Sequence, residues 1–171
     1  GIDTVSFHRA LRSVLRQDPD VIMIGEMRDP NSISIALTAA ETGHLVFSTL
    51  HTNSASQTID RIVDSFPAAQ QGQIRSQLAT TLIGIVSERL VPRISGGRIP
   101  ACEIMFANSA IKNLIREKKT YQIDLVIETS VQEGMMSLNR SLIELVRKRE
   151  ISLESAENYS LNPTELRQLI G

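Results

Sequence analysis

The chain has 171 residues, a formal net charge of −1 and a single cysteine. A chain of this length buries roughly 70% of its unfolded surface, which is enough for one substantial core. The balance of 18 basic against 19 acidic residues argues against electrostatic binding of nucleic acid. Cys102 alone forms neither an internal disulfide nor a multi-cysteine zinc site, and this suits a reducing cytosol. No run of about 18 uncharged apolar residues is present, so we expect no direct membrane insertion.

The amino-terminal segment is predicted to form a helix that ends near Asp18 and Pro19. Its apolar residues recur at helical spacing: Phe7, Leu11, Val14 and Leu15. The run Val21–Gly25 that follows is short, apolar and without alternation. This pattern is typical of a strand covered on both faces, as in a parallel sheet.

A helix and a second strand are predicted to follow this first strand. Asp29 is a candidate N-cap with Pro30 at the first helical position, and Gly43 marks the helix end. The second strand is expected at Leu45–Leu50. Such a βαβ crossover is right-handed in ~98% of cases and places its two strands parallel. The carboxyl ends of both strands therefore share one edge of the sheet, where ligands of open α/β sheets bind.

The rest of the chain is predicted to contain two helices separated by Pro67, a β-hairpin that turns at Ser95–Gly97, and a helical tail. In chain order, these segments are 59–66, 74–82, 83–94, 98–106, 109–119, 137–150 and 163–170. The expected fold class is α/β, with a β-hairpin and a helical carboxyl-terminal region after the α/β part.

Glu26 is the first candidate for chemistry, because it follows a buried strand directly. A carboxylate in that position can hold Mg²⁺ through water, or orient and deprotonate a water that attacks a phosphate, as on a Walker B strand. The alternative is a charged strand end that pairs with Arg28 or caps the next helix. Composition alone leaves both interpretations open.

His51 follows the second strand, so the shared edge places it near Glu26. An imidazole there can sense charge or donate a proton, and the run Thr49–Asn53 offers further groups that can hydrogen-bond a terminal phosphate. His44 precedes the same strand and is separated from His51 by seven residues at ~3.3 Å each. One phosphate cannot contact both histidines, so His44 is interpreted as a structural or interface residue.

A phosphate-binding loop of the form G-x-x-x-x-G-K-[ST] is absent from the sequence. A Walker B strand without such a loop has nothing to hold a triphosphate. Two alternatives follow: either the protein is not a nucleotide hydrolase, or the loop lies upstream of Gly1.

The segment LRQDPDVIMIGEMRDPNSISIALTAAETGHLVFSTLHTN resembles the Walker B and His-box region of the secretion-superfamily ATPases that drive type IV pili and type II secretion. The resemblance implies a RecA-like P-loop NTPase core that lacks its Walker A part, at residues 1–106, followed by a helical region at 107–171. It implies that Glu26 is the Walker B glutamate and that His51 lies near the γ-phosphate. Thr49, from the same run, is a further candidate for binding the nucleotide. His44 matches the other His-box histidine.

A second motif points to the branch of this superfamily that retracts pili. The segment SAIKNLIREKK resembles the AIRNLIRE motif of that branch, with lysine where arginine is usual. Relatives that extend pili or secrete proteins carry a four-cysteine zinc insert, which one cysteine cannot form. The matching residues are Ala110, Ile111, Lys112, Asn113, Leu114, Ile115, Arg116 and Glu117.

The resemblance implies a homohexameric motor that uses ATP and Mg²⁺ to power pilus retraction, with Glu26 as a metal contact through water. It implies a cytoplasmic location at the bacterial inner membrane, against a platform protein of the pilus, without nucleic acid. For this chain alone we expect no ATPase activity. The alternatives are an extension or secretion ATPase without the zinc insert, and a nonenzymatic assembly or regulatory module.

Overall fold

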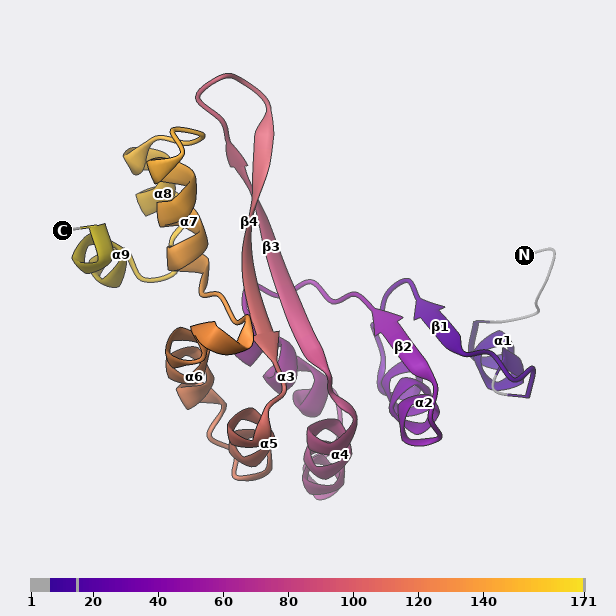
Figure 1. Cartoon of the computed structure of the whole chain (residues 1–171). Coiled ribbons are helices and arrows are strands. Elements are labelled where there is room, and N and C mark those ends of the chain that lie inside the picture. The colour runs from indigo at the N-terminus through magenta and orange to yellow at the C-terminus, as the bar shows by residue number, and fades with distance from the viewer. Residues whose placement is uncertain (1–6, 15, 171) are drawn as a thin grey trace.

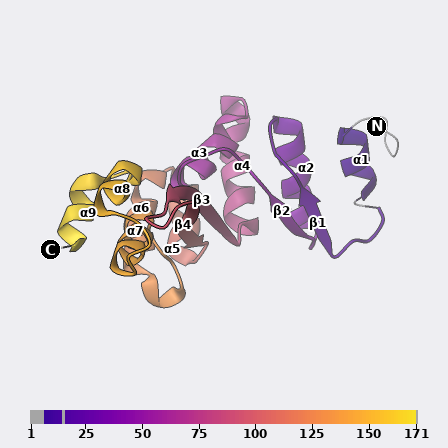
Figure 2. The ribbon, with the colours of Figure 1, turned by 90° about the horizontal axis from the view of Figure 1, so that it is seen from above.

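The computed structural model describes residues 7–14 and 16–170. Helix α1 spans Phe7–Val14, in agreement with the helical spacing. Leu15 and the side chains of Phe7 and Leu11 lie outside the described part of the chain. Figures 1 and 2 show the elements in a row, from α1 and the first two strands at one end to the carboxyl-terminal helices at the other.

The predicted βαβ unit is present. Strand β1 (Val21–Ile24) and strand β2 (Leu45–Ser48) pair in parallel, and helix α2 (Pro30–Glu41) connects them. Asp29 caps α2, since its side chain accepts a hydrogen bond from the backbone N–H of Ser32 at 3.0 Å. After α2 the chain reverses through Gly43, whose φ of 99° lies in the left-handed region.

The prediction that β1 is covered on both faces is wrong within the described residues. Ile22 and Ile24 are buried against α2, but Met23 on the opposite face is 67% exposed. Phe47, which pairs with Met23 on β2, is 53% exposed. Among the described residues, helix α2 packs on one face of this two-stranded sheet and leaves the other face exposed.

Two helices and a long hairpin follow β2, as predicted. Helix α3 spans Ala55–Asp64 and helix α4 spans Ala68–Thr81. Strands β3 (Gly84–Pro92) and β4 (Arg98–Phe106) form an antiparallel hairpin whose turn extends beyond the neighbouring helices in Figure 1. Each strand contains one proline, Pro92 or Pro100, near the turn end of this two-stranded hairpin, where a missing N–H is tolerated. The outer edge of β4 is partly paired further along, since Ile104 forms an antiparallel bridge with Met136.

The carboxyl-terminal region is helical, as predicted, but contains more elements than expected. Helices α6 and α8 were not anticipated. Each has only seven residues, although Ile123, Val126 and Ile127 of α6 fall at the helical spacing i, i+3 and i+4. In chain order the elements are α5 (Ser109–Arg116), η1 (Thr120–Gln122), α6 (Ile123–Thr129), η2 (Val131–Glu133), α7 (Leu138–Arg147), α8 (Leu153–Tyr159) and α9 (Pro163–Ile170).

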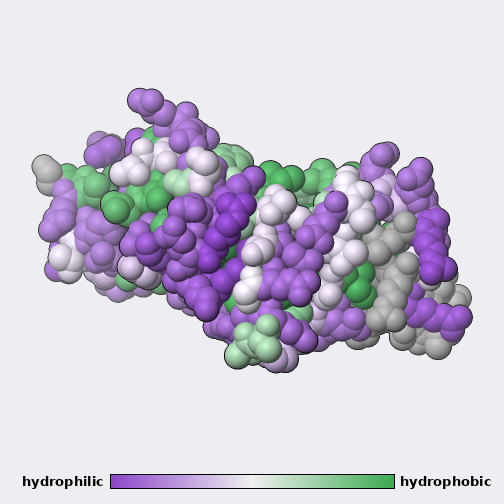
Figure 3. Space-filling model, turned by 90° about the horizontal axis from the view of Figure 1, so that it is seen from below, coloured by the Kyte–Doolittle hydropathy of each residue, from purple (hydrophilic) through white to green (hydrophobic). Residues whose placement is uncertain are grey.

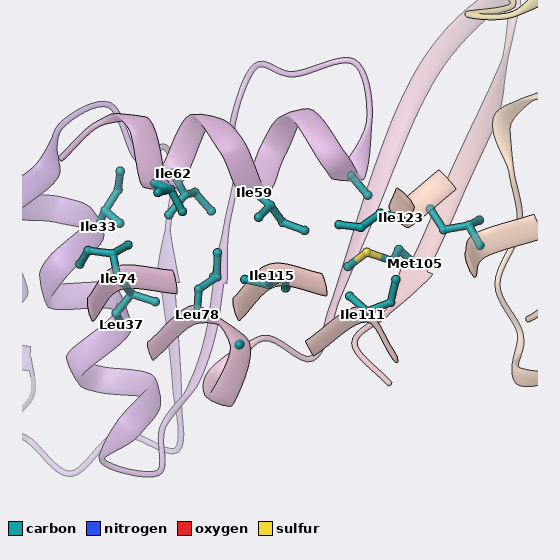
Figure 4. Packing of buried hydrophobic residues seen from close by; sticks show 14 of the residues in the cluster. Ile33, Leu37, Ile59, Ile62, Ile74, Leu78, Met105, Ile111, Ile115 and Ile123 are labelled. Atoms are coloured by element: carbon teal, nitrogen blue, oxygen red, sulfur yellow. The ribbon is translucent and has the colours of Figure 1, made fainter. Parts of the chain in front are cut away.

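The largest hydrophobic cluster joins helices from distant parts of the sequence. Figure 4 shows side chains of α2, α3, α4 and α5 meeting one another and Met105 of β4. A second cluster lies between the hairpin and helices α7, α8 and α9. On the face shown in Figure 3, hydrophobic residues form separate patches within a mostly hydrophilic surface. In the part of the chain that the structure describes, no helix is long and apolar enough to cross a bilayer.

Two carboxyl groups meet between α6 and α9. A hydrogen bond with Glu165 raises the pKa of Glu128 to about 7, and burial and the charges of Glu165 and Asp124 add to the shift. Asn139 also donates to Glu165, over 3.0 Å. As pH rises through this pKa, Glu128 loses the proton with which it hydrogen-bonds to Glu165, and its negative charge then lies beside that of Glu165.

We predict that Glu128→Gln stabilises the protein at high pH. The raised pKa gives a stabilising contribution that is complete below the ordinary glutamate pKa and is lost as pH rises through about 7. Glutamine keeps a donor for Glu165 at every pH. Because Glu128 is exposed and its charge is screened, we expect a gain of about 1 kcal/mol at about pH 8 and little at about pH 5.

Urea denaturation at both pH values measures this difference, with Glu154→Gln in the first turn of α8 as the control. An equal effect of Glu128→Gln at the two pH values would show that the pKa of Glu128 is not raised by its contact with Glu165.

Candidate functional site

The site begins where the two parallel strands end. Glu26 follows β1 after Gly25, and His51 follows β2 after Leu50. Two hydrogen bonds join the strand exits: the N–H of Met27 donates to the carbonyl of Thr49 at 3.2 Å, and Thr49 Oγ1 donates to the carbonyl of Gly25 at 2.5 Å. These two hydrogen bonds hold the backbones of the two strand exits together at the shared edge.

Glu26 contacts two partners at this edge. Its Oε1 lies 3.2 Å from Nε2 of His51, and its Oε2 lies 2.5 Å from a guanidinium nitrogen of Arg28. The Glu26 side chain is 24% exposed, whereas the His51 side chain is 82% exposed. The expectation that Glu26 and His51 lie together is confirmed. The ion pair with Arg28, which was the alternative for Glu26, is formed as well.

The surroundings keep Glu26 ionised. The hydrogen bond from Arg28 is the largest cause that lowers the pKa of Glu26, burial opposes it, and the charges of Arg28 and His51 lower it further. An ionised carboxylate with one oxygen toward an exposed imidazole can accept a proton or hold a water. His51 is the most exposed of the three side chains, so its ring is accessible at the strand edge.

Helix α3 forms the opposite wall of a groove of about 660 Å³. The groove is lined by Glu26, Met27, Arg28, Leu50, His51, Gln57, Asp60, Arg61, Asp64 and Ser65. The sequence reasoning missed the α3 residues. Gln57, Arg61 and Asp64 are spaced i, i+4 and i+7, so this polar face of a helix directly after His51 was the available signal.

Helix α3 is positioned by a side-chain cap and by its apolar face. The Ser54 side chain accepts from the N–H of Gln57 at 3.3 Å, and Ile59, Ile62 and Val63 are buried in the large cluster. These contacts turn the polar face of α3 toward the groove.

His44 lies at the far end of β2 and takes no part in the groove. Its Nδ1 is 3.0 Å from the carbonyl of Ala39 and 3.1 Å from Oγ1 of Thr42. The ring packs on the carboxyl end of α2, in agreement with a structural role.

The eight residues that resemble the retraction motif lie on α5 and its C-cap. Ile111 and Ile115 are fully buried and Leu114 packs against the same cluster, in agreement with a packing role. Asn113, Arg116 and Glu117 are exposed, as is Ala110, while Lys112 is half-buried. Glu117 pairs with Lys119 at 2.7 Å and accepts from Asn113 at 3.1 Å. None of the eight lines the groove.

The segment after α5 reaches α3 through one buried hydroxyl that the sequence reasoning did not single out. Thr120 is 7% exposed, and its hydroxyl lies 2.9 Å and 3.1 Å from the two carboxylate oxygens of Asp60. Arg75 of α4 approaches the same carboxylate at 3.9 Å. Asp60 therefore joins the groove to α4 and to η1.

The groove offers one carboxylate for a metal at the strand edge. Within residues 7–14 and 16–170, no group of three or more histidine, cysteine or acidic side chains is arranged to hold a metal ion. Mg²⁺ commonly takes one or two protein carboxylates and completes its shell with water and phosphate oxygens. Glu26 fits that limited role.

The chain belongs to the family described as Type II/IV secretion system protein, whose model matches residues 2–168. The mixed α/β fold, with two parallel strands that end in an acid and an imidazole, agrees with this assignment.

Within the family the chain is similar to pilus retraction ATPases. It is 52% identical over 161 residues to the type IV pilus retraction ATPase PilT of Pseudomonas aeruginosa, covering 94% of this chain and 47% of that protein. A crystal structure of the pilus retraction motor PilT with bound ADP matches with a TM-score of 0.87 and 50% identity, over 98% of this chain and 47% of that one. The type IV pilus assembly ATPase PilB of Thermus thermophilus is 49% identical, but over only 53% of this chain and 9% of that protein. The chain spans about half the length of the PilT proteins it matches.

We predict that Thr120→Val destabilises the protein by about 1–2 kcal/mol, because valine preserves the shape but removes a buried hydrogen bond to a carboxylate. Thr129→Val is the matched control, since the Thr129 hydroxyl is exposed and bonds only within its own helix. Urea denaturation compares the two. Equal free energies of unfolding for both variants would mean that the contact with Asp60 contributes nothing to stability.

Proposed function

We propose that this chain forms the Walker B and His-box part of an ATP-hydrolysing motor that powers type IV pilus retraction and twitching motility. The observation that carries the proposal is the 3.2 Å contact between Glu26 and His51 at the shared strand edge. Similarity to PilT along 94% of the chain supports retraction as the process that is driven.

The proposed roles follow from position and charge. Glu26 orients or deprotonates the attacking water, or holds Mg²⁺ through water, and its contact with Arg28 keeps it ionised. His51 projects from the edge to contact the terminal phosphate, and Thr49 supports both by fixing the strand exits. MgATP, when bound, supplies the phosphoryl group that is transferred to water.

The finer features of the motor belong to the same proposal. Family resemblance supports a homohexamer that contacts a platform protein at the cytoplasmic side of the bacterial inner membrane. We further propose that residues 1–106 belong to the ATPase core and that 107–171 form a helical region. In that region, Lys112, Arg116 and Glu117 are the candidates for relaying motion or meeting a neighbour. Arg116 and Glu117 are exposed and Lys112 is half-buried, which leaves all three some access to a partner.

An extension or secretion ATPase is the nearest alternative. The match to PilB covers only 53% of this chain, whereas the match to PilT covers 94%. The extent of the match therefore favours retraction.

A nonenzymatic assembly module is the alternative from another class. The 171 residues contain no phosphate-binding loop, so we expect this chain alone to hydrolyse no ATP. Hydrolysis by the full-length protein separates the motor from the module.

We predict that Glu26→Gln in the full-length protein lowers ATP turnover at least about 10²-fold and leaves nucleotide affinity within about threefold. Glutamine keeps the size of the side chain but can neither accept a proton nor carry the charge. Steady-state hydrolysis and binding of a fluorescent ATP analogue measure the two effects, with Glu154→Gln as the control. Normal turnover by Glu26→Gln would remove Glu26 from the reaction.

A further inference from the structure

A buried carboxylate on the hairpin contacts the amino terminus of α3. Glu103 of β4 is 6% exposed, and its Oε1 accepts a hydrogen bond from the backbone N–H of Ala55 at 2.6 Å. The two residues are 48 positions apart in the sequence. Burial raises the pKa of Glu103, and the hydrogen bond from Ala55 opposes that shift. Burying this carboxylate therefore costs free energy, which the hydrogen bond with the Ala55 amide partly offsets.

The amide that donates to Glu103 lies at the amino terminus of α3, where backbone N–H groups need acceptors from outside the helix. Ala55 is the first residue of α3, and amides in the first turn of a helix have no acceptor within the helix. The Ser54 side chain satisfies Gln57, and Glu103 satisfies Ala55. A carboxylate also interacts favourably with the positive end of the helix dipole.

The segment between β2 and α3 is therefore held at both of its ends. At one end, Thr49 bonds to Gly25 of the neighbouring strand exit. At the other, Glu103 holds Ala55, four residues after His51. Between these ends, the hydroxyl of Thr52 lies 2.7 Å from that of Thr58 on α3. A short loop with both ends fixed restricts where the His51 backbone can lie.

We propose that Glu103 is a positioning residue for His51, acting through the Ala55 amide rather than through any contact with the ligand. The proposal rests on the proposed function for its effect on ATP hydrolysis. It also links the hairpin to the site, because β4 leads within three residues of Glu103 to its end at Phe106 and then to α5. A shift of β4 along its axis moves the loop that carries His51.

The variants separate the hydrogen bond from the bulk of the side chain. Glu103→Met matches the length of glutamate, adds no polar atom and leaves the Ala55 amide without its acceptor. Glu103→Gln keeps an oxygen that can accept from Ala55. Glu88→Gln is the matched control, because Glu88 lies on the partner strand of the same hairpin and is exposed.

The first measurement uses this chain and does not depend on activity. By NMR, Glu103→Met should speed hydrogen exchange of the Ala55 amide at least tenfold and shift the ring signals of His51, while those of His44 stay unchanged. Glu103→Gln and Glu88→Gln should resemble the wild type. If Ala55 exchange and the His51 ring are unaffected by Glu103→Met, the positioning role is wrong.

The second measurement uses ATP hydrolysis by the full-length protein. Glu103→Met should lower kcat about tenfold or more, with less than a threefold change in KM. Glu103→Gln should retain most of the wild-type kcat. In a His51→Ala background, Glu103→Met should lower kcat no further. An equal loss of kcat in both backgrounds would show that Glu103 acts elsewhere. If Glu26→Gln retains turnover, the proposed function fails, and the NMR result still decides the role of Glu103.

Discussion

The parallel pairing of β1 with β2 is the constraint on which the site depends. Pairing in one direction brings both strand exits to one edge, where backbone and hydroxyl hydrogen bonds between Thr49 and the Gly25–Met27 turn fix them. The positions of Glu26 and His51, which follow the two strands, are then restricted. A slip of one residue in register would turn Ile22 and Ile24 to the uncovered face. Correct burial of these isoleucines and correct placement of the acid next to the imidazole are thus one and the same requirement.

Helix α3 connects this edge to the rest of the molecule. Its apolar face packs into the large cluster, its polar face lines the groove, and its first amide is held by the hairpin. Asp60 adds a contact to Thr120 beyond the retraction motif. Helix α3 thus contacts the groove, the hairpin and the segment that follows α5.

Much of this architecture could be predicted from the sequence, and the failures have physical causes. Periodicity, Asp29, Pro30 and Gly43 were sufficient for the βαβ unit, because caps and strands are determined locally. The link from Glu103 to Ala55 could not be predicted, since it joins residues 48 positions apart and a lone glutamate in a strand has no pattern. The same holds for Thr120 and Asp60. Helix α6 was missed although Ile123, Val126 and Ile127 fall at helical spacing, because seven residues give the pattern only one repeat.

The face of the sheet that α2 leaves uncovered has a practical consequence. Val21, Met23, Leu45 and Phe47 lie side by side there and are all exposed. Contiguous apolar surface beside open strand edges promotes self-association. Recombinant samples of this chain are therefore expected to scatter light increasingly as they are concentrated, and mild detergent or a solubilising fusion tag should keep them monodisperse.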